Sequence, residues 1–333
     1  MSLIRSYERA QGIPLRQRSG VIVITAAASY LVVAAVVMYY LLPVGFAMEG
    51  AELLLAQVGT VLVGAAVVAY VATTVRRGIR RRAALWALAD DAGWEYAADV
   101  SDRIWGGSID EQIERSARTT TDYLRAAQPV PFDTAERVFS VGSGEGATLH
   151  TTRMVRIPLS AEAPRITLRS RRGGGALSAL PRVPHGRSEL TLEGNFSDVF
   201  VVSVPHGYEV DALYLLTPDL MAILLDHASE CDLEIIDATL HLYLSPLDLS
   251  DPHELSGFLT VVGVLHERFS RRTALYRDDA APPVDADAYR RAGDTLAQGA
   301  RSIDARARVG PIAAAVLAPL VPLAIGLVWT QFA

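Results

Sequence analysis

The side chains best suited to acid–base chemistry are the seven histidines, and their spacing limits what they can do. None lies four residues from another, and no H-E-x-x-H or Cys/His pattern typical of a zinc site is present. His227 beside Asp226 is the best candidate for a general base. No second catalytic group is recognisable near it, and a surface or capping role is the alternative interpretation. We therefore predict no catalytic residue, no cofactor and no metal site.

Two amino-acid types are scarce in a way that excludes further chemistry. All 31 basic residues are arginine, so Schiff-base catalysis and any phosphate loop that needs a lysine are excluded. Cys231 is the single cysteine, which excludes an intrachain disulfide and a cysteine-rich metal site. No G-x-S-x-G pattern supplies a serine nucleophile.

Two other patterns resemble binding motifs but have simpler interpretations. The glycine-rich "VGSGEGA" at 141–147 lacks the spacing of a phosphate loop and leads into a predicted strand, so we expect a hairpin turn. Asp211, Asp219 and Asp226 recur every seven or eight residues, and on one helix face they could bind a hard cation. Since Thr217 and Pro218 predict a helix start, Asp211 falls outside that helix, and a solvated face is the alternative.

Three uncharged apolar runs are long enough to cross a hydrocarbon core of about 30 Å: Val21–Leu42, Leu53–Val75 and Ile312–Phe332. The apolar core of the first is too long for an ordinary cleaved signal peptide, which favours a retained anchor. Ala56, Thr60 and Gly64 recur every four residues and could form a close-packing helix face. Charged residues are missing from all three runs, so neither a transporter nor a channel is indicated.

Arginines stand before the first run and after the second but not in the loop between them, and this predicts how the runs are oriented in the membrane. The first run is preceded by arginines, the loop "PVGFAMEGAE" has none, and five follow the second run in "TVRRGIRRR". Arginine is retained on the cytoplasmic side, so we expect the amino terminus and residues 83–308 inside and the carboxyl terminus outside. The five arginines are a topological feature and candidate contacts for anionic lipid: Arg76, Arg77, Arg80, Arg81 and Arg82. The net charge of −6 argues against nucleic acid as their partner.

The soluble part predicts an α+β fold with mostly antiparallel strands, beside three transmembrane helices. Short β-branched runs separated by Gly, Pro and Ser predict strands at 94–100, 138–141, 149–159, 165–170, 189–194 and 198–204, and a hairpin at 233–244 turning near Asp237. Residues 101–134 are weakly patterned and predict helix and loop, while helices are expected from 217 and over 253–272. The resulting division is a cytoplasmic segment at 1–20, a membrane hairpin at 21–75, a cytoplasmic domain at 76–280, a linker and helix at 281–308, and a third span at 309–333.

Charge is unevenly distributed within the soluble part. Eight arginines and one acid, Glu162, lie within 152–187. In contrast, 188–267 contains acidic residues and no arginine. Pairing of basic and acidic strands across one sheet is the first explanation. A membrane-facing basic surface is the second, and an anionic ligand or nucleic acid is the third. We expect Arg171 and Arg172, in a glycine-rich loop, to be exposed and available for anion or lipid contact.

Several stretches resemble an actinobacterial family of membrane proteins with no established activity. They are "GWEY" (93–96), "LEGNFSDVF" (192–200), "YEVDALYLLTPDLMAILLD" (208–226) and "DLEIIDATLHLY" (232–243). The resemblance covers most of residues 20–275 and implies a hairpin of membrane helices before a cytoplasmic domain. It implies placement in a bacterial cell membrane and no activity.

These observations favour a multi-pass membrane protein whose cytoplasmic α+β domain binds a protein partner or a small ligand without catalysis, as a scaffold, sensor or regulator. The alternative is a membrane-tethered hydrolase or transferase that uses carboxylates and His227. The expected partners are the membrane, anionic lipid, and either another protein or a second copy of the chain, rather than nucleic acid.

Overall fold

The computed structural model describes residues 6–7, 15–100, 105–114, 118–142, 146–173, 176–180 and 186–276. Within these residues the chain divides into two compact units, with the boundary after Ala83. The predicted third span at 309–333 lies outside the described residues.

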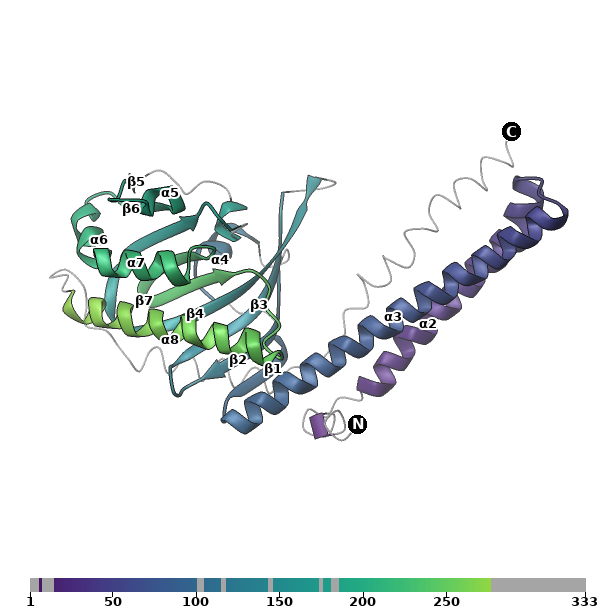
Figure 1. Ribbon diagram of the computed structural model, residues 1–333, viewed down its shortest axis with the longest axis horizontal. Coiled ribbons are helices and arrows are strands. Elements are labelled where there is room, and N and C mark those ends of the chain that lie inside the picture. The colour runs from purple at the N-terminus through teal and green to yellow at the C-terminus, as the bar shows by residue number, and fades with distance from the viewer. Residues whose placement is uncertain are drawn as a thin grey trace. The chain divides into compact units, whose positions relative to one another are not determined.

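The first unit is a pair of long apolar helices (Figure 1). Helix α2 (Leu15–Val36) continues into the π-helical segment η1 (Val37–Gly45), and α3 (Gly50–Ala92) returns beside it. Two stretches are long and apolar enough to cross a membrane, Val23–Gly45 and Gly50–Ala92, and only 6% of the most apolar window of each is buried. Such exposure of apolar side chains is unfavourable in water and favourable in lipid.

Gly64, the last of the three small residues noted in the sequence, is a point where α3 packs against α2. Gly64 is buried, and a Cβ atom at this position would overlap the ring of Tyr30 on α2. The hydroxyl of Tyr30 donates a hydrogen bond to the carbonyl of Thr60, one turn earlier on α3. Small residues therefore let the backbones come together here, as in other packed membrane helices.

We expect Gly64→Leu to separate α2 from α3 at a cost of about 1–3 kcal/mol, because the added side chain overlaps Tyr30. The measurement is the disulfide yield between cysteines placed at Met38 and Gln57. These positions are close, because the side-chain amide of Gln57 lies 3.4 Å from the backbone carbonyl of Met38. Gly59→Leu is the matched control, because a Cβ at Gly59 meets nothing within 4 Å. Equal yields in the two variants would contradict this packing.

The second unit is an antiparallel sheet of seven strands with helices, an α+β fold. The strand order is β1-β2-β3-β4-β6-β5, and β7 pairs with β4. The strands are β1 (Glu95–Val100), β2 (Arg118–Ala126), β3 (Phe132–Val141), β4 (Thr148–Ser170), β5 (Arg187–Leu190), β6 (Phe200–Pro205) and β7 (Asp232–Leu244). The helical segments are α4 (Ser108–Gln112), η4 (Ala176–Ser178), α5 (Phe196–Val199), α6 (Glu209–Leu215), α7 (Pro218–His227) and α8 (Pro252–Leu275).

Strand β4 is the centre of this sheet. It pairs with β3 through Thr148–Arg156, with β7 through Arg153–Leu168 and with β6 through Thr167–Ser170. Register shifts between Pro158 and Ile166 interrupt its pairing with β7. One long bent strand therefore joins all parts of the sheet.

The two faces of the sheet carry two separate cores. Alternate residues of β4 and β7, such as Ile166, Leu168, Leu233 and Ile235, pack with the end of α3 and with α6, α7 and α8. Figure 1 shows α7 and α8 lying across this face. The other face holds a smaller core around Trp105, which includes side chains of the segment 105–113 and of the segment 176–180.

Most of the predicted elements are present, and four predictions need correction. Within 101–134, where helix and loop were expected, the short helix α4 is present at Ser108–Gln112, but β2 and the start of β3 are strands. The strands predicted at 149–159 and 165–170 are one strand, and residues 196–199 are helical ahead of β6. The predicted hairpin at 233–244 is the continuous strand β7, because β4 pairs with both halves of it. Opposite the left-handed Asp237 (φ 52°) the pairing shifts register, with the extra residues on β4.

The helix ends agree better with the residue types in the sequence. α3 ends at Ala92, where Gly93 takes a left-handed conformation (φ 68°), and α7 begins at Pro218. Thr217 occupies the N-cap position of α7, but its hydroxyl is buried without a hydrogen-bond partner. The predicted start of the helix is therefore right, although the Thr217 side chain does not cap it.

Candidate functional site

The face of the sheet opposite α7 and α8 carries buried polar groups. On β7, Glu234, His241 and Tyr243 point to this face, while their neighbours belong to the larger core. The alternation of side chains along β7 changes sides around the left-handed Asp237, so the face is occupied by Glu234 before it and by His241 after it. Segment 105–113, with the short helix α4, contributes side chains to the small core on this face.

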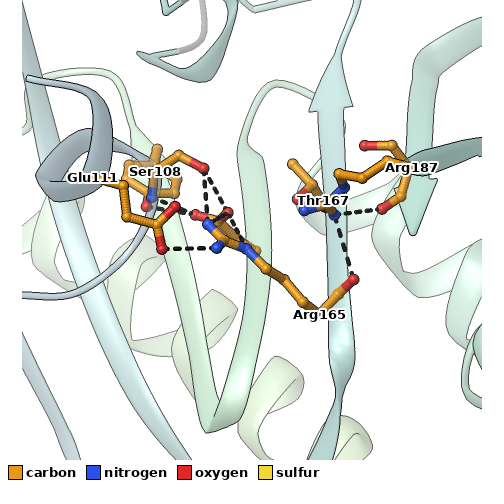
Figure 2. A network of polar contacts seen from close by, with 8 residues as sticks. Ser108, Glu111, Arg165, Thr167 and Arg187 are labelled. Atoms are coloured by element: carbon orange, nitrogen blue, oxygen red, sulfur yellow. Dashed lines mark hydrogen bonds and ion pairs between the residues drawn. The ribbon is translucent and has the colours of Figure 1, made fainter. Parts of the chain in front are cut away.

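A network of polar contacts joins Ser108, Glu111 and Arg165 (Figure 2), and Glu234 accepts hydrogen bonds at its centre. Its carboxylate is fully buried and accepts hydrogen bonds from the Ser108 amide (3.0 Å) and hydroxyl (2.6 Å), from the Arg165 guanidinium (2.8 Å) and from the Tyr243 hydroxyl (3.0 Å). Burial alone would raise the pKa of Glu234, but the hydrogen bonds from Ser108 and Arg165 hold it below its usual value. The carboxylate is therefore ionised and neutralised by Arg165.

Glu111, on α4, completes this network from the solvent side. It accepts a hydrogen bond of 2.7 Å from Arg165, and its side chain is 51% exposed, compared with 0% for Glu234. Arg165 therefore bridges a buried and an exposed carboxylate (Figure 2). Gly107 allows this close approach, because a Cβ at Gly107 would overlap the Tyr243 hydroxyl and lie 3.3 Å from Glu234.

A second buried carboxylate holds the same segment at its other end. Asp110 accepts from the backbone amide of Trp105 and forms ion pairs with Arg118 and with Arg137, the latter at 2.6 Å. The side chains of Asp110, Arg118 and Arg137 are 3%, 9% and 1% exposed. One buried carboxylate thus pairs with two guanidiniums, so these three side chains together keep one positive charge.

Arg156 links this cluster to the sheet. Its guanidinium lies 4.6 Å from the ring centroid of Trp105, donates to the Trp105 carbonyl (3.2 Å) and pairs with Asp133 on β3. His241 is also buried here, and burial lowers its pKa to about 4, so its imidazole is neutral near pH 7. Its Nδ1 atom has no hydrogen-bond partner.

These polar groups fasten a segment to a sheet, and the geometry does not make a nucleophile of Ser108. Its hydroxyl donates to Glu234, and Arg165 bonds to both groups, so the pKa of the carboxylate that would act as base is held low and the carboxylate is a weak proton acceptor. Among the described residues, no group of three or more His, Cys, Asp or Glu side chains is arranged to hold a metal ion. The network is best described as a structural clamp with one arginine at its exposed edge.

The residues singled out from the sequence lie elsewhere. His227 is exposed at the end of α7, and Asp211 lies on α6, apart from Asp219 and Asp226 on α7. Arg76, Arg77 and Arg80 are exposed on α3, while Arg81 and Arg82 are half-buried. Arg171 and Arg172 are exposed, as expected. Their contact with anions or lipid stays a prediction.

The arginine-rich stretch at 152–187 does not form a single exposed basic surface. Arg153 is fully buried beside Glu136 (3.6 Å), Arg156 pairs with Asp133, and Arg165 pairs with Glu234. The predicted pairing of this arginine-rich stretch with the acidic stretch 188–267 thus holds for Arg165, which pairs with Glu234. Arg153 and Arg156 pair instead with carboxylates of β3. Arg182 lies outside the described residues.

Sequence reasoning missed the clamp. Glu234 alternates with Leu233 and Ile235 in a strand pattern that ordinarily predicts a solvated carboxylate, because alternation assigns a residue to a face without telling what covers it. Ser108 lies in a weakly patterned stretch. Only the covering of the second face by 105–113 brings the two together.

Comparison with known proteins gives little further guidance. No family model matches the sequence, and no curated protein matches it. Among solved structures, the mycobacterial trehalose monomycolate transport factor A, TtfA, matches with a TM-score of 0.38 and 13% identity, over 62% of this chain and 97% of that chain. A likeness at this level carries no argument about function.

Proposed function

We propose that this chain is a multi-pass protein of a bacterial cell membrane whose cytoplasmic α+β domain binds another protein without catalysing a reaction. We place it with the actinobacterial membrane proteins that its sequence resembles. The proposed layout keeps the divisions predicted from the sequence, with the hairpin at 21–75, the domain at 76–280, the linker and helix at 281–308 and a third span at 309–333. The carrying observation is an exposed apolar surface on the second unit.

That surface, the α6 surface, consists of large side chains on α6 and at the end of α8. Val210, Leu213 and Tyr214 follow helical spacing and are 77%, 51% and 48% exposed. Leu275 is 60% exposed beside them, and the Tyr214 hydroxyl donates to its carbonyl (3.3 Å). Figure 1 places α6 next to the end of α8.

The α6 surface favours a protein partner over solvent. The opposite side of α6 buries Ala212 and Leu215 in the core, so the helix is apolar on both sides. Contiguous exposed apolar side chains of this kind are common where proteins associate. The buried carboxylates Glu234 and Asp110, by contrast, are occupied by arginines and other donors, which is why we favour binding over the hydrolase or transferase.

Site-specific crosslinking tests the proposal. We expect a photoreactive residue at Leu213 of the full chain, expressed in its own cells, to give a discrete protein adduct, and Leu213→Glu with the photoreactive residue at Val210 to abolish it. Thr260, exposed on α8 away from α6, is the matched control position. An adduct of twice the chain mass identifies a second copy as the partner. No protein adduct at Leu213, or equal adducts at Leu213 and Thr260, would contradict the proposal.

The orientation has its own test, and the native cysteine makes it simple. Cys231 is buried, and burial raises the pKa of its thiol to about 12, so it reacts poorly with maleimides. In intact cells we expect a membrane-impermeant maleimide to label Glu49→Cys, in the loop between the spans, and to label Ser256→Cys only after lysis. Both positions are exposed. Labelling of Ser256→Cys in intact cells would overturn the cytoplasmic placement.

A further inference from the structure

Three arginines lie on the polar face of the sheet where β4, β5 and β6 meet. Arg165 and Arg169 alternate with core residues along β4, on either side of the buried Thr167. Thr167 is paired with Ser203 of β6, and Arg187 of β5 extends across β6 towards it (Figure 2). These three guanidiniums therefore share one end of the polar face.

Arg165 is neutralised and Arg187 is not. One terminal nitrogen of Arg187 donates only to neutral oxygens. They are the hydroxyl of Thr167 (2.9 Å) and the backbone carbonyls of Ser203 (2.9 Å) and Arg165 (3.3 Å). Its Nε atom is buried without a partner. Burial lowers the pKa of Arg187, and the positive charges of Arg165 and Arg169 lower it further.

Arg169 is less well compensated still. Its side chain is half-buried, and its Nε and one terminal nitrogen are buried without hydrogen-bond partners. Within the described part of the chain, no carboxylate forms an ion pair with Arg169 or Arg187, and this includes Glu189, which is exposed on the same face of β5. Two guanidiniums thus hold buried donors that nothing in the described chain uses.

We propose that Arg169 and Arg187 form a binding site for a phosphate group, with the exposed Arg171 and Arg172 as its outer approach. Buried donors on a charged group are unfavourable without an acceptor, and an oxyanion supplies both the acceptors and the opposite charge. The planar guanidinium matches two phosphate oxygens at once, which favours arginine at such sites. Arg171 and Arg172 lie two and three residues after Arg169 in the chain and raise the local concentration of anions. The proposal does not depend on the α6 surface or on the side of the membrane.

The test uses the full chain in an uncharged detergent, with inorganic phosphate as the probe. At constant ionic strength, with phosphate replacing chloride, we expect saturable binding by calorimetry. R169Q and R187Q each weaken it about tenfold, since each removes charge-assisted hydrogen bonds. R271Q is the matched control, because Arg271 is 60% exposed and pairs with Glu267 on the surface of α8. R187Q also loses three internal hydrogen bonds, so R169Q, which loses none, keeps the test decisive if R187Q does not fold.

Nanodiscs distinguish the two sources of a phosphate group. If the site binds a lipid headgroup, phosphatidylglycerol added to phosphatidylcholine discs weakens the apparent affinity of wild type for inorganic phosphate, and if it binds free phosphate the affinity is unchanged. Either outcome keeps the site and assigns its ligand. No phosphate binding by wild type beyond that of chloride, or an equal loss in R169Q and R271Q, would overturn the proposal.

Discussion

Glu234→Ala is expected to destabilise the protein by about 3–5 kcal/mol, which is the usual result of removing one partner from a buried ion pair. The substitution leaves Arg165 without its buried partner and also strands the Ser108 amide and hydroxyl and the Tyr243 hydroxyl. The Ser108 and Tyr243 donors are then enclosed without the acceptor they have now, while Arg165 keeps Glu111. The segment 105–113 should loosen first, because Ser108 is its direct link to β7.

The matched control is Glu111→Ala, which removes the other carboxylate bound to Arg165. Since Glu111 is 51% exposed, water replaces it, and the loss should stay below about 1 kcal/mol. The measurement is chemical denaturation of the full chain in detergent, followed by the fluorescence of the buried Trp105. Similar losses in the two variants would mean that Glu234 does not hold the segment.

A pH titration of stability should reveal His241. Its pKa is near 6.5 when unfolded and about 4 when folded, because burial disfavours the charged imidazolium. Below pH 6.5 the unfolded chain therefore binds a proton that the folded chain does not, and stability falls as the pH falls towards 4. A difference of about 2.5 pKa units corresponds to about 3 kcal/mol lost across this window.

His241→Gln, which does not titrate, should remove that part of the pH dependence while lowering stability at pH 7.5 through altered packing. The comparison with wild type cancels contributions from His266, whose pKa burial also lowers, and from carboxylates such as Glu234, whose contribution is lost at lower pH. His227→Gln is the control, because its side chain is exposed. The measurement is the denaturation midpoint between pH 7.5 and 4.5. An unchanged slope in His241→Gln would show that His241 is accessible to protons in the folded protein.

The sequence predicted the parts of this structure that depend on local chemistry. Long uncharged runs give the two apolar helices, Gly93 ends α3, Pro218 begins α7, and alternation marks most of the strands. It did not predict whether a strand ends at a turn-like residue or continues through it. The stretch "IIDAT" around the left-handed Asp237 suggests a turn, yet the strand continues through it, because β4 lies alongside both halves of β7.

The polar clamp and the arginine site were less predictable for the same reason. Glu234, Asp110 and Arg187 come from segments up to 126 residues apart, as the bond between Ser108 and Glu234 illustrates. No spacing rule relates them, and their charges suggest solvated positions. The contrast between basic and acidic halves did point to ion pairs, but it could not distinguish Arg165, which has one, from Arg187, which has none among the described residues.

The long strand β4 has a consequence for how the domain opens. Its 23 residues hydrogen-bond to β3 and β6 at its two ends and to β7 along most of its length. No half of the sheet can detach without breaking bonds to this strand, so its central amides should exchange with solvent deuterium only through opening of the whole sheet. Fraying should be confined to β1 and β5, the two ends of the strand order, and the domain should lose its sheet as a single cooperative unit.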